Sequence, residues 1–260
     1  MSDVVHQHFR PAEQAIVKRL EEFSSGVERT GVSRRTDFLS PREAWIAQII
    51  CAKYSLAVSL YGGYEHAERQ RAIISDVHEH PGEENFEVVA VRVDVPKGSS
   101  TLRHGDFLGA LLGVGIRRDG LGDIAFLPDH TAYVFCTKQM VNILLRDFTQ
   151  VGKTSVTIRV DEQPPISQFL ASTLMEQKVT LQSLRLDAFL AHAFGMSRSK
   201  AVEPIRSGKV QLNHVLCVEP SQEIVEHDVV SLRGSGRARV MGIEGNSRSG
   251  RIFVRIGRYV

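Results

Sequence analysis

The last third of the chain changes its hydrophobic period at Gly208, from that of helices to that of strands, and this restricts the possible folds more than any other feature. Before Gly195 the apolar residues recur at the spacing of an amphipathic helix, at Leu186, Phe189, Leu190 and Ala193. Ser197 is placed to cap a second helix, which Gly208 ends. Residues 209–213 then alternate as a strand does, and residues 228–232 are expected to form another strand. Two short helices across a tight turn, followed directly by strands, predict a compact α+β module that begins with a helix-turn-helix-like pair.

The charge of the chain is divided unevenly along its length. From residue 181 onward the sequence holds 12 Lys and Arg against 7 Asp and Glu, whereas the preceding part holds 20 against 23. Ten of the twelve C-terminal cations are arginines. A guanidinium can donate two parallel hydrogen bonds to a phosphate and can stack on a base. The C-terminal region is therefore expected to bind nucleic acid, and a solvated basic surface without a ligand is the alternative.

The start of the second C-terminal helix is the sharpest candidate site. Its first turn holds Arg198, Ser199 and Lys200 after the cap Ser197, so free backbone amides and two cationic side chains are expected to converge there. Such a helix start favours phosphate. An ordinary capped surface helix is the alternative, but cations in the first turn of a helix are mildly unfavourable. Their presence therefore indicates an anionic partner.

Further cations are expected to extend this surface. Arg206 and Lys209 continue it toward the strand that follows the helix. On the last predicted strand, Arg251, Phe253 and Arg255 share one face, because apolar residues alternate with them. An aromatic ring between two arginines could stack on a base while the cations hold phosphates. The alternative is that Phe253 packs against a neighbouring domain.

Residues 1–78 are expected to form a mainly helical N-terminal domain. Pro11 fits the first turn of an amphipathic helix. Ser40 and Glu43 form a capping box at the start of a second helix. A short strand is expected after it, and then a polar helix from about residue 65, where Glu and Arg are frequent.

Residues 79–163 are expected to form a second domain with the order β-α-β-β-α-β, that of a ferredoxin-like or RRM-like sandwich. Its strands are predicted at 86–95, 124–127, 131–135 and 155–160, and its helices at 105–115 and 139–147. In an RRM-like sheet, bases stack on aromatic residues of the central strands. Tyr133 and Phe135 are the candidates, with Arg92 and Arg159 near them, and a place for Phe135 in the core is the alternative.

The sequence carries no motif of a known catalytic or cofactor site. It has neither a phosphate-binding P-loop nor a nucleophile elbow. Gly109, Gly113 and Gly115 lie inside a helical pattern, so close packing of a helix on a sheet is their expected cause. The three cysteines are far apart, which indicates neither a zinc site nor a disulfide framework. We therefore expect no cofactor, no bound metal and no catalytic activity.

Composition and length bound the class of protein. A chain of 260 residues with 42% hydrophobic and 24% charged residues is expected to form two or three globular domains. No apolar run approaches the roughly 18 residues needed to span a bilayer. The N-terminus has neither a secretory nor a transit signal. We therefore expect a cytoplasmic protein without membrane insertion. The sequence leaves the oligomeric state open, and a monomer is the expectation.

The C-terminal motifs resemble the S4 RNA-binding domain. They are Arg-Leu-Asp at 185–187, Ser-Arg-Ser-Lys-Ala at 197–201, Ser-Gly-Lys-Val-Gln-Leu-Asn at 207–213, Pro-Ser at 220–221 and Asp-Val-Val-Ser-Leu-Arg-Gly at 228–234. The resemblance implies an S4 domain, with its αL motif, at 180–260. It also implies that the first turn of the second helix docks on structured RNA, with Arg185 beside that turn.

The expected RNA-binding residues are Arg185, Ser197, Arg198, Ser199, Lys200, Arg206, Lys209, Asn213, Arg233, Arg251 and Arg255. Two residues depart from the S4 pattern. Pro204 lies within the second helix, where it removes a backbone hydrogen bond. His214 follows Asn213 at a position where many S4 domains have glycine. Both leave the first turn of the helix intact.

Motifs elsewhere resemble the bacterial YlmH family and cover nearly the whole chain in the family's order. They are His-Phe-Arg at 8–10, Thr-Asp-Phe-Leu-Ser-Pro-Arg-Glu at 36–43, Arg-His-Gly-Asp-Phe-Leu-Gly-Ala-Leu-Leu-Gly at 103–113 and Gly-Asp-Ile at 122–124. The resemblance implies an N-terminal domain, an RRM-like middle domain and a C-terminal S4 domain. It further implies binding to rRNA or tRNA on the large ribosomal subunit in translation quality control.

Two alternatives remain. S4 domains often accompany RNA-modifying enzymes, and cyanobacterial relatives are labelled photosystem II S4 domain proteins. The protein could therefore be an RNA-modifying enzyme or a photosystem II assembly factor. A modifying enzyme would need a catalytic aspartate in an Arg-Leu-Asp-type strand loop, but that tripeptide lies inside the S4 motif itself, at residues 185–187.

Overall fold

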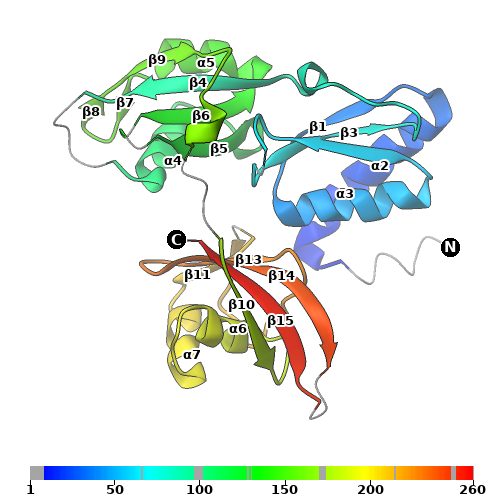
Figure 1. Cartoon of the computed structure of the whole chain (residues 1–260), viewed down its shortest axis with the longest axis vertical. Coiled ribbons are helices and arrows are strands. Elements are labelled where there is room, and N and C mark those ends of the chain that lie inside the picture. Colours follow the sequence, from blue (N-terminus) through cyan, green and yellow to red (C-terminus); the bar gives the residue numbers. More distant parts are fainter. Residues whose placement is uncertain are drawn as a thin grey trace. The chain divides into compact units, whose positions relative to one another are not determined.

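The computed structural model describes residues 9–65, 67–96, 102–127, 129, 131–169, 174–213, 215–246 and 250–259. The chain forms two compact units, residues 1–170 and residues 171–260 (Figure 1). Both units combine helices with antiparallel sheets, so the predicted α+β class is confirmed. Among the residues described, no helix is long and apolar enough to cross a membrane.

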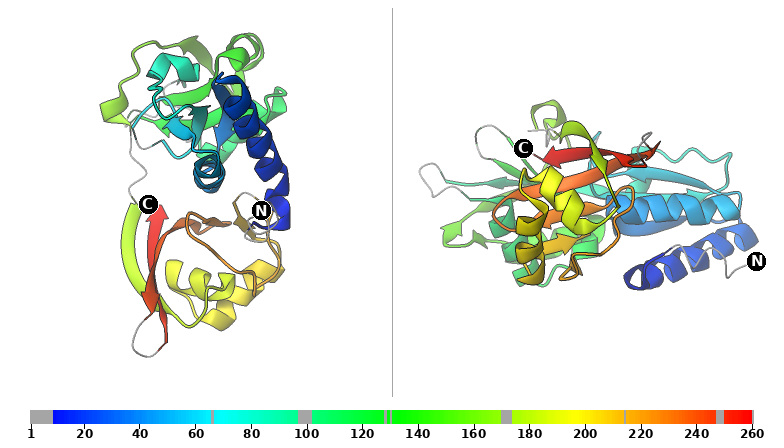
Figure 2. Two further views of the ribbon diagram at one scale, coloured as in Figure 1. Left: turned by 90° about the vertical axis from the view of Figure 1, so that its right-hand side faces the viewer. Right: turned by 90° about the horizontal axis from the view of Figure 1, so that it is seen from below.

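The N-terminal part of the first unit packs two helices on a three-stranded sheet. The two predicted helices and the short strand expected after them are confirmed, whereas the other two strands were not predicted. The sheet has the order β1-β3-β2, formed by β1 (Arg34–Leu39), β3 (Gln70–Ser75) and β2 (Ala57–Tyr61). Helices α2 (Gln14–Thr30) and α3 (Pro41–Lys53) share one hydrophobic core with it (Figure 2). We call this sheet the N-terminal sheet.

The polar helix predicted from about residue 65 is wrong, because the central strand β3 occupies part of that segment. Arg69 and Arg71 made the run look like the surface of a helix, but both are buried. The Arg69 guanidinium donates to the Phe38 carbonyl at 3.0 Å, and that of Arg71 donates to the Thr36 carbonyl at 2.8 Å. Because backbone carbonyls accept from both guanidinium groups, Arg71 can be buried within β3 and Arg69 just before it.

The predicted start of α3 is confirmed. The Ser40 hydroxyl accepts from the Glu43 amide at 3.4 Å, and the Glu43 carboxylate accepts from the Ser40 amide at 2.7 Å. In the same turn, the buried Arg42 donates to the Glu13 carboxylate at 2.9 Å and lies over the Trp45 ring, 4.4 Å from its centroid. The polar residues of this motif therefore fix the contact between the two helices.

Residues 88–160 form the predicted β-α-β-β-α-β sandwich. Its antiparallel sheet, here called the central sheet, has the order β5-β6-β4-β9, with strands β4 (Val88–Asp94), β5 (Leu121–Phe126), β6 (Ala132–Thr137) and β9 (Thr157–Val160). The helices are α4 (His104–Gly113) and α5 (Val141–Asp147), and a small hairpin of β7 (Gln150–Val151) and β8 (Thr154–Ser155) precedes β9. Both helices share one core with the sheet, so the ferredoxin-like topology is confirmed.

The glycines of α4 do not mark close packing, contrary to the expectation from the sequence. A Cβ added at Gly109 or Gly113 would meet no atom within 4 Å, and nothing in the structure explains these two glycines. The helix buries Phe107 and Leu111 against the central sheet instead. Gly115 follows the helix with a φ of +86°, a left-handed conformation that favours glycine.

Asp123 of β5 joins the two sheets of the first unit. Its carboxylate accepts hydrogen bonds from the Tyr64 hydroxyl at 2.8 Å, the Glu68 amide at 2.7 Å and the Arg69 amide at 3.0 Å. The last two donors belong to the loop that leads into β3 of the N-terminal sheet. One carboxylate therefore fixes this loop on the central sheet.

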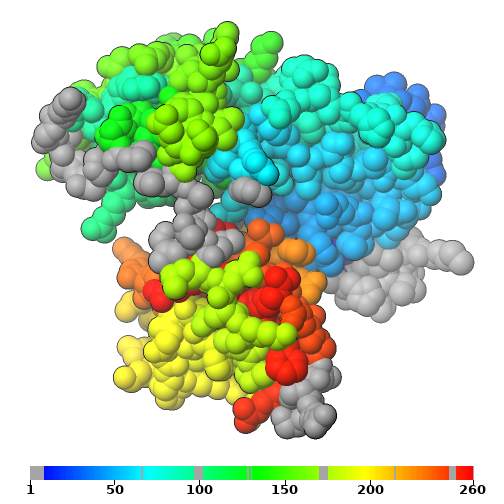
Figure 3. Space-filling view, in the orientation of Figure 1, coloured from blue at the N-terminus to red at the C-terminus, as the bar shows by residue number. Residues whose placement is uncertain are grey.

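The second unit is a six-stranded antiparallel sheet with two helices on one face (Figure 2). Its elements are β10 (Leu174–Leu181), α6 (Leu186–Ala193), α7 (Arg198–Arg206), β11 (Val210–Leu212), β12 (Val215–Leu216), β13 (Val229–Leu232), β14 (Gly236–Asn246) and β15 (Ile252–Tyr259). The two predicted helices and the strands after them are confirmed. The sequence had not predicted β10, an edge strand that pairs with β15 along its whole length; atoms of both segments are visible on the side of this unit that Figure 3 shows.

Candidate RNA-binding surface

The first turn of α7 is capped and exposed, as the sequence predicted. The Ser197 hydroxyl accepts from the Lys200 amide at 3.3 Å and lies 3.1 Å from the Ser199 hydroxyl. Residues 197–200 are all exposed, and the side chain of Arg198 is 45% accessible. The turn therefore presents backbone amides and two cationic side chains to solvent, an arrangement that suits a phosphate.

Asp187 holds two of the predicted cations together. Its carboxylate, 5% exposed, accepts from Arg185 at 3.0 Å and lies 3.2 Å from a guanidinium nitrogen of Arg198. Burial by itself would raise the pKa of Asp187, but the hydrogen bonds from Arg185 and Arg198 outweigh it and lower this pKa. The carboxylate therefore stays ionised at neutral pH and anchors both guanidinium groups. Arg185 lies beside the first turn of α7, as the resemblance implied.

Pro204 does not end the helix that contains it. Helix α7 runs through it to Arg206, and the Pro204 carbonyl still accepts from the Lys209 amide at 2.9 Å. A proline at this position lacks an amide that would otherwise bond the carbonyl of Lys200, one turn earlier. The exposed first turn is intact. The other departure from the S4 pattern, His214, lies outside the described residues.

Lys209 and Arg233 lie close together at the end of the sheet. The Arg233 amide donates to the Lys209 carbonyl at 2.9 Å, and both residues are exposed, as is Arg206 at the end of α7. Asn213 has a different setting. Its side-chain amide donates to Asp228 at 2.8 Å, and its side-chain oxygen accepts from the Val229 amide at 2.9 Å. The side-chain nitrogen and oxygen of Asn213 therefore both bond the start of β13 and hold the turn after β11 against it.

The residues of the patch predicted on the last strand make more contacts with other side chains of the protein than the sequence indicated. Phe253 and Arg255 do share one face, since Val254 between them and Ile256 after them are buried. Arg255 lies 2.6 Å from Glu244 and 3.6 Å from Glu176, carboxylates of the two neighbouring strands. The Lys178 ammonium lies over the ring of Phe253, 5.1 Å from its centroid. Arg255 is therefore partly neutralised, and Phe253 has a cation on its exposed side.

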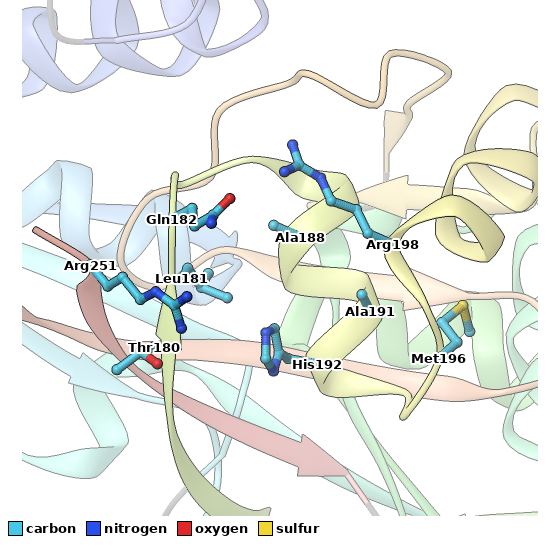
Figure 4. A pocket seen from close by; sticks show the side chains of 9 residues that line it. All are labelled: Thr180, Leu181, Gln182, Ala188, Ala191, His192, Met196, Arg198 and Arg251. Atoms are coloured by element: carbon cyan, nitrogen blue, oxygen red, sulfur yellow. The ribbon is translucent and has the colours of Figure 1, made fainter. Parts of the chain in front are cut away.

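The structure brings Arg198 and Arg251 together, although 53 positions separate them in the sequence. Both line one cavity between α6 and the start of β15 (Figure 4). The sequence placed them in two separate patches. Nothing in the sequence alone indicated this convergence, because it depends on the pairing of β10 with β15.

The central sheet does not offer its aromatic residues for base stacking. Tyr133 and Phe135 are 0% and 1% exposed. The rings of Phe169 and Tyr64 lie on them, and the Tyr133 hydroxyl donates to Asp161 at 2.7 Å. The alternative expectation, a core position for Phe135, is confirmed, and it applies to Tyr133 as well. Of the two arginines expected nearby, Arg92 pairs with Asp94 at 2.7 Å, and Arg159 lies 3.6 Å from the same carboxylate.

Among the residues described, few groups could support metal or thiol chemistry. In the part of the chain that the structure describes, no three His, Cys, Asp or Glu side chains are grouped so that they could hold a metal ion. Cys51 and Cys136 are buried, and this burial raises the pKa of both thiols, that of Cys136 to about 12. Neither thiol is therefore ionised at neutral pH, as a nucleophile would have to be.

Comparison with known families gives two matches. The family model described as the N-terminal domain of YlmH matches residues 12–78. The model described as a putative RNA-binding domain in YlmH matches residues 81–164. Among solved structures, the chain is similar to the cell division protein YlmH from Streptococcus pneumoniae, with a TM-score of 0.51 and 21% identity. That match covers 59% of this chain and 93% of the other.

A curated relative extends the similarity over nearly the full length. The ribosome-associated protein quality control protein P2 of Bacillus subtilis (strain 168) is 32% identical over 248 residues, which is 95% of either chain. Such identity over such a length shows common ancestry, and the matches to the family models agree with it. The chain therefore belongs to the YlmH family.

Proposed function

We propose that this protein binds RNA on the ribosome, in quality control of translation, without catalysing a reaction itself. The observation that carries the proposal is the exposed first turn of α7. There Arg185 and Arg198 are held by one buried carboxylate, that of Asp187, and Lys200 lies in the same turn. A positively charged surface built on a helix start is suited to the phosphates of a structured RNA.

The comparisons support this reading in two ways. The relative from Bacillus subtilis is named as a ribosome-associated quality control protein, and one family model is described as a putative RNA-binding domain. We propose that the RNA is rRNA, tRNA or both, on the large ribosomal subunit. We further propose that the protein acts in the cytoplasm, as a monomer, and needs no cofactor.

Within the predicted set of RNA-binding residues, we propose that contact centres on Arg185 and residues 197–200. Arg206, Lys209 and Arg233 would extend it, because all three are exposed. Asn213 would act indirectly, since its side chain is engaged within the protein. Arg255 would contribute less than the exposed cations of α7, because two carboxylates face Arg255.

We also propose that the chain has three domains, at residues 1–78, 79–163 and 180–260. Separate sheets and separate hydrophobic cores support these limits. Asp123 and the aromatic cluster around Phe169 would then be contacts between the first two domains, which explains why those two form one compact unit.

Sedimentation with ribosomes tests the proposed function. The full chain is expected to co-sediment with the large subunit at low salt and to be released at high salt, because phosphate binding releases counterions. Fractionated large and small subunits, run side by side, separate a specific site from general affinity for RNA. Sedimentation of the protein free of both subunits at low salt would contradict the proposal.

A further inference from the structure

The second unit contains a cavity of about 340 Å³ beside the proposed RNA surface. This volume falls at the lower end of the roughly 300–1,000 Å³ that is usual for small-molecule sites. Its walls come from the end of β10, the side of α6 that carries Ala188, Ala191 and His192, the turn before α7 and the residue before β15. The lining residues are Thr180, Leu181, Gln182, Ala188, Ala191, His192, Met196, Arg198 and Arg251 (Figure 4).

The lining combines an apolar floor with a cationic rim. Leu181, Ala188 and Ala191 are buried and form the floor, and the short alanine side chains on α6 leave the space open. Arg198, whose guanidinium also lies 3.2 Å from the Asp187 carboxylate outside the lining, and Arg251 supply the cationic groups at the rim. None of the nine lining residues carries a carboxylate. A ligand that suits this site has an apolar part for the floor and an anionic part for the rim.

His192 and Arg251 suit a flat ligand. They extend into the cavity from opposite sides, His192 from α6 and Arg251 from the segment before β15 (Figure 4). Histidine rings and guanidinium planes are both surfaces on which unpaired RNA bases stack. Thr180 and Gln182 on β10 and the turn after it add hydroxyl and amide groups that can bond the polar edge of a base.

We infer that this cavity accepts a single unpaired nucleotide of the bound RNA, with its base between His192 and Arg251 and its phosphate at Arg198. The inference rests on the proposed function and specifies one element of the RNA, a bulged or looped base. Arg198 belongs to both surfaces, so a base that leaves the stack next to the phosphates at α7 would lie at the entrance of the cavity. A base that is paired within a helix cannot enter, because it must first leave the stack.

Two hairpin RNAs of equal length test the inference, one with a single 2-aminopurine bulge and one fully paired. The full-length protein is compared with Ala191→Leu, which fills the cavity, and with His192→Ala, an exposed position that should fold normally. We expect each variant to weaken binding of the bulged RNA by about tenfold, the usual range for loss of one base stack, and to leave the paired RNA unchanged. The 2-aminopurine fluorescence should change on binding to the wild type only. His78→Ala, an exposed histidine of the first unit, is the matched control.

The outcomes separate this inference from the proposed function. If neither RNA binds the wild type at low salt, both fail. If both RNAs bind and the cavity variants affect them equally or not at all, only the cavity inference fails. If free AMP binds the wild type as tightly as the bulged RNA and competes with it, the site belongs to a free mononucleotide, and the assignment to an RNA base is wrong.

Discussion

The ring of Phe169 lies on that of Tyr133, with 5.1 Å between the two centroids. Phe169 also contacts Phe135 at 5.8 Å and Tyr64 at 5.5 Å, so it closes an aromatic cluster on the face of the central sheet opposite the helices. In RRM domains this face carries the bases. In this protein the same face of the central sheet is covered by Phe169, near the end of the first unit, and by Tyr64, which follows β2 of the N-terminal sheet.

Phe169→Ala should destabilise the first unit. Removing a ring that is 8% exposed should lower the free energy of unfolding by about 3 kcal/mol, because apolar packing is removed and a cavity remains. Urea unfolding followed by tryptophan fluorescence measures this, because Trp45 is the only tryptophan and lies in the first unit. The matched control is Ile166→Ala in the same segment. Ile166 is 40% exposed, so its replacement should lower the free energy of unfolding much less. Equal small losses in both variants would show that Phe169 does not hold the cluster.

Arg198→Ala with Lys200→Ala should weaken RNA binding without unfolding the protein. Arg198→Ala removes one of the two guanidinium groups that bond the buried Asp187 carboxylate, so the free energy of unfolding should fall by about 1 kcal/mol while the fold remains, because Arg185 still bonds that carboxylate. The affinity should fall for all RNA sequences alike, and the slope of log affinity against log salt should decrease by about one for each phosphate that the variant no longer binds. Thermal melting and salt-dependent binding are measured together. The double variant Arg146→Ala with Lys153→Ala removes the same charge from exposed positions of the first unit and should leave the slope unchanged.

Asp123→Ala should weaken the joint between the N-terminal and central sheets. Three donors lose their acceptor, the Tyr64 hydroxyl and the amides of Glu68 and Arg69. Leaving these part-buried donors without an acceptor should lower the free energy of unfolding by about 3 kcal/mol in total. Hydrogen exchange at the two amides should rise by a large factor, and the free energy of unfolding should fall. Asp129→Ala, an exposed aspartate nearby in the sequence, is the control. Unchanged protection of both amides would contradict the assigned role.

Local signals in the sequence predicted local structure well. The capping box of Ser40 and Glu43 and the cap of Ser197 depend on residues three positions apart, so a single sequence contains the whole signal. The β-α-β-β-α-β order was likewise visible, since each strand and helix has its own period. The helix pair around Gly195 was predicted for the same reason.

Features that depend on distant partners could not be predicted. Strand β3 was missed because Arg69 and Arg71 look like surface residues until their carbonyl acceptors, on segments more than 30 positions away, are known. Tyr133 appeared available for stacking because Phe169 covers it from outside the RRM-like sequence pattern. The cavity beside α7 needs Arg251, which only strand pairing brings near Arg198.

Asp187→Asn provides a test that depends on pH. The folded protein lowers the pKa of Asp187 below its ordinary value of 3.8, because the hydrogen bonds from Arg185 and Arg198 outweigh the effect of burial. A group whose pKa is lower in the folded state adds stability above its unfolded pKa and loses it as the pH falls through the folded value. At pH 7 the variant should therefore be less stable than the wild type by about 1–2 kcal/mol, a modest figure because both arginines are partly exposed.

The difference between the two proteins should stay constant from pH 7 to about 5 and shrink below the ordinary aspartate pKa of 3.8. Urea unfolding of both proteins at pH 7, 5 and 3 measures it. Glu203→Gln, which removes an exposed carboxylate of α7, should stay within about 0.5 kcal/mol of the wild type at pH 7. The Asp187→Asn variant should also bind RNA less tightly at pH 7, since Arg185 and Arg198 lose the carboxylate that orients them. A difference in stability that grows as the pH falls would show that Asp187 is not the ionised anchor of the two arginines.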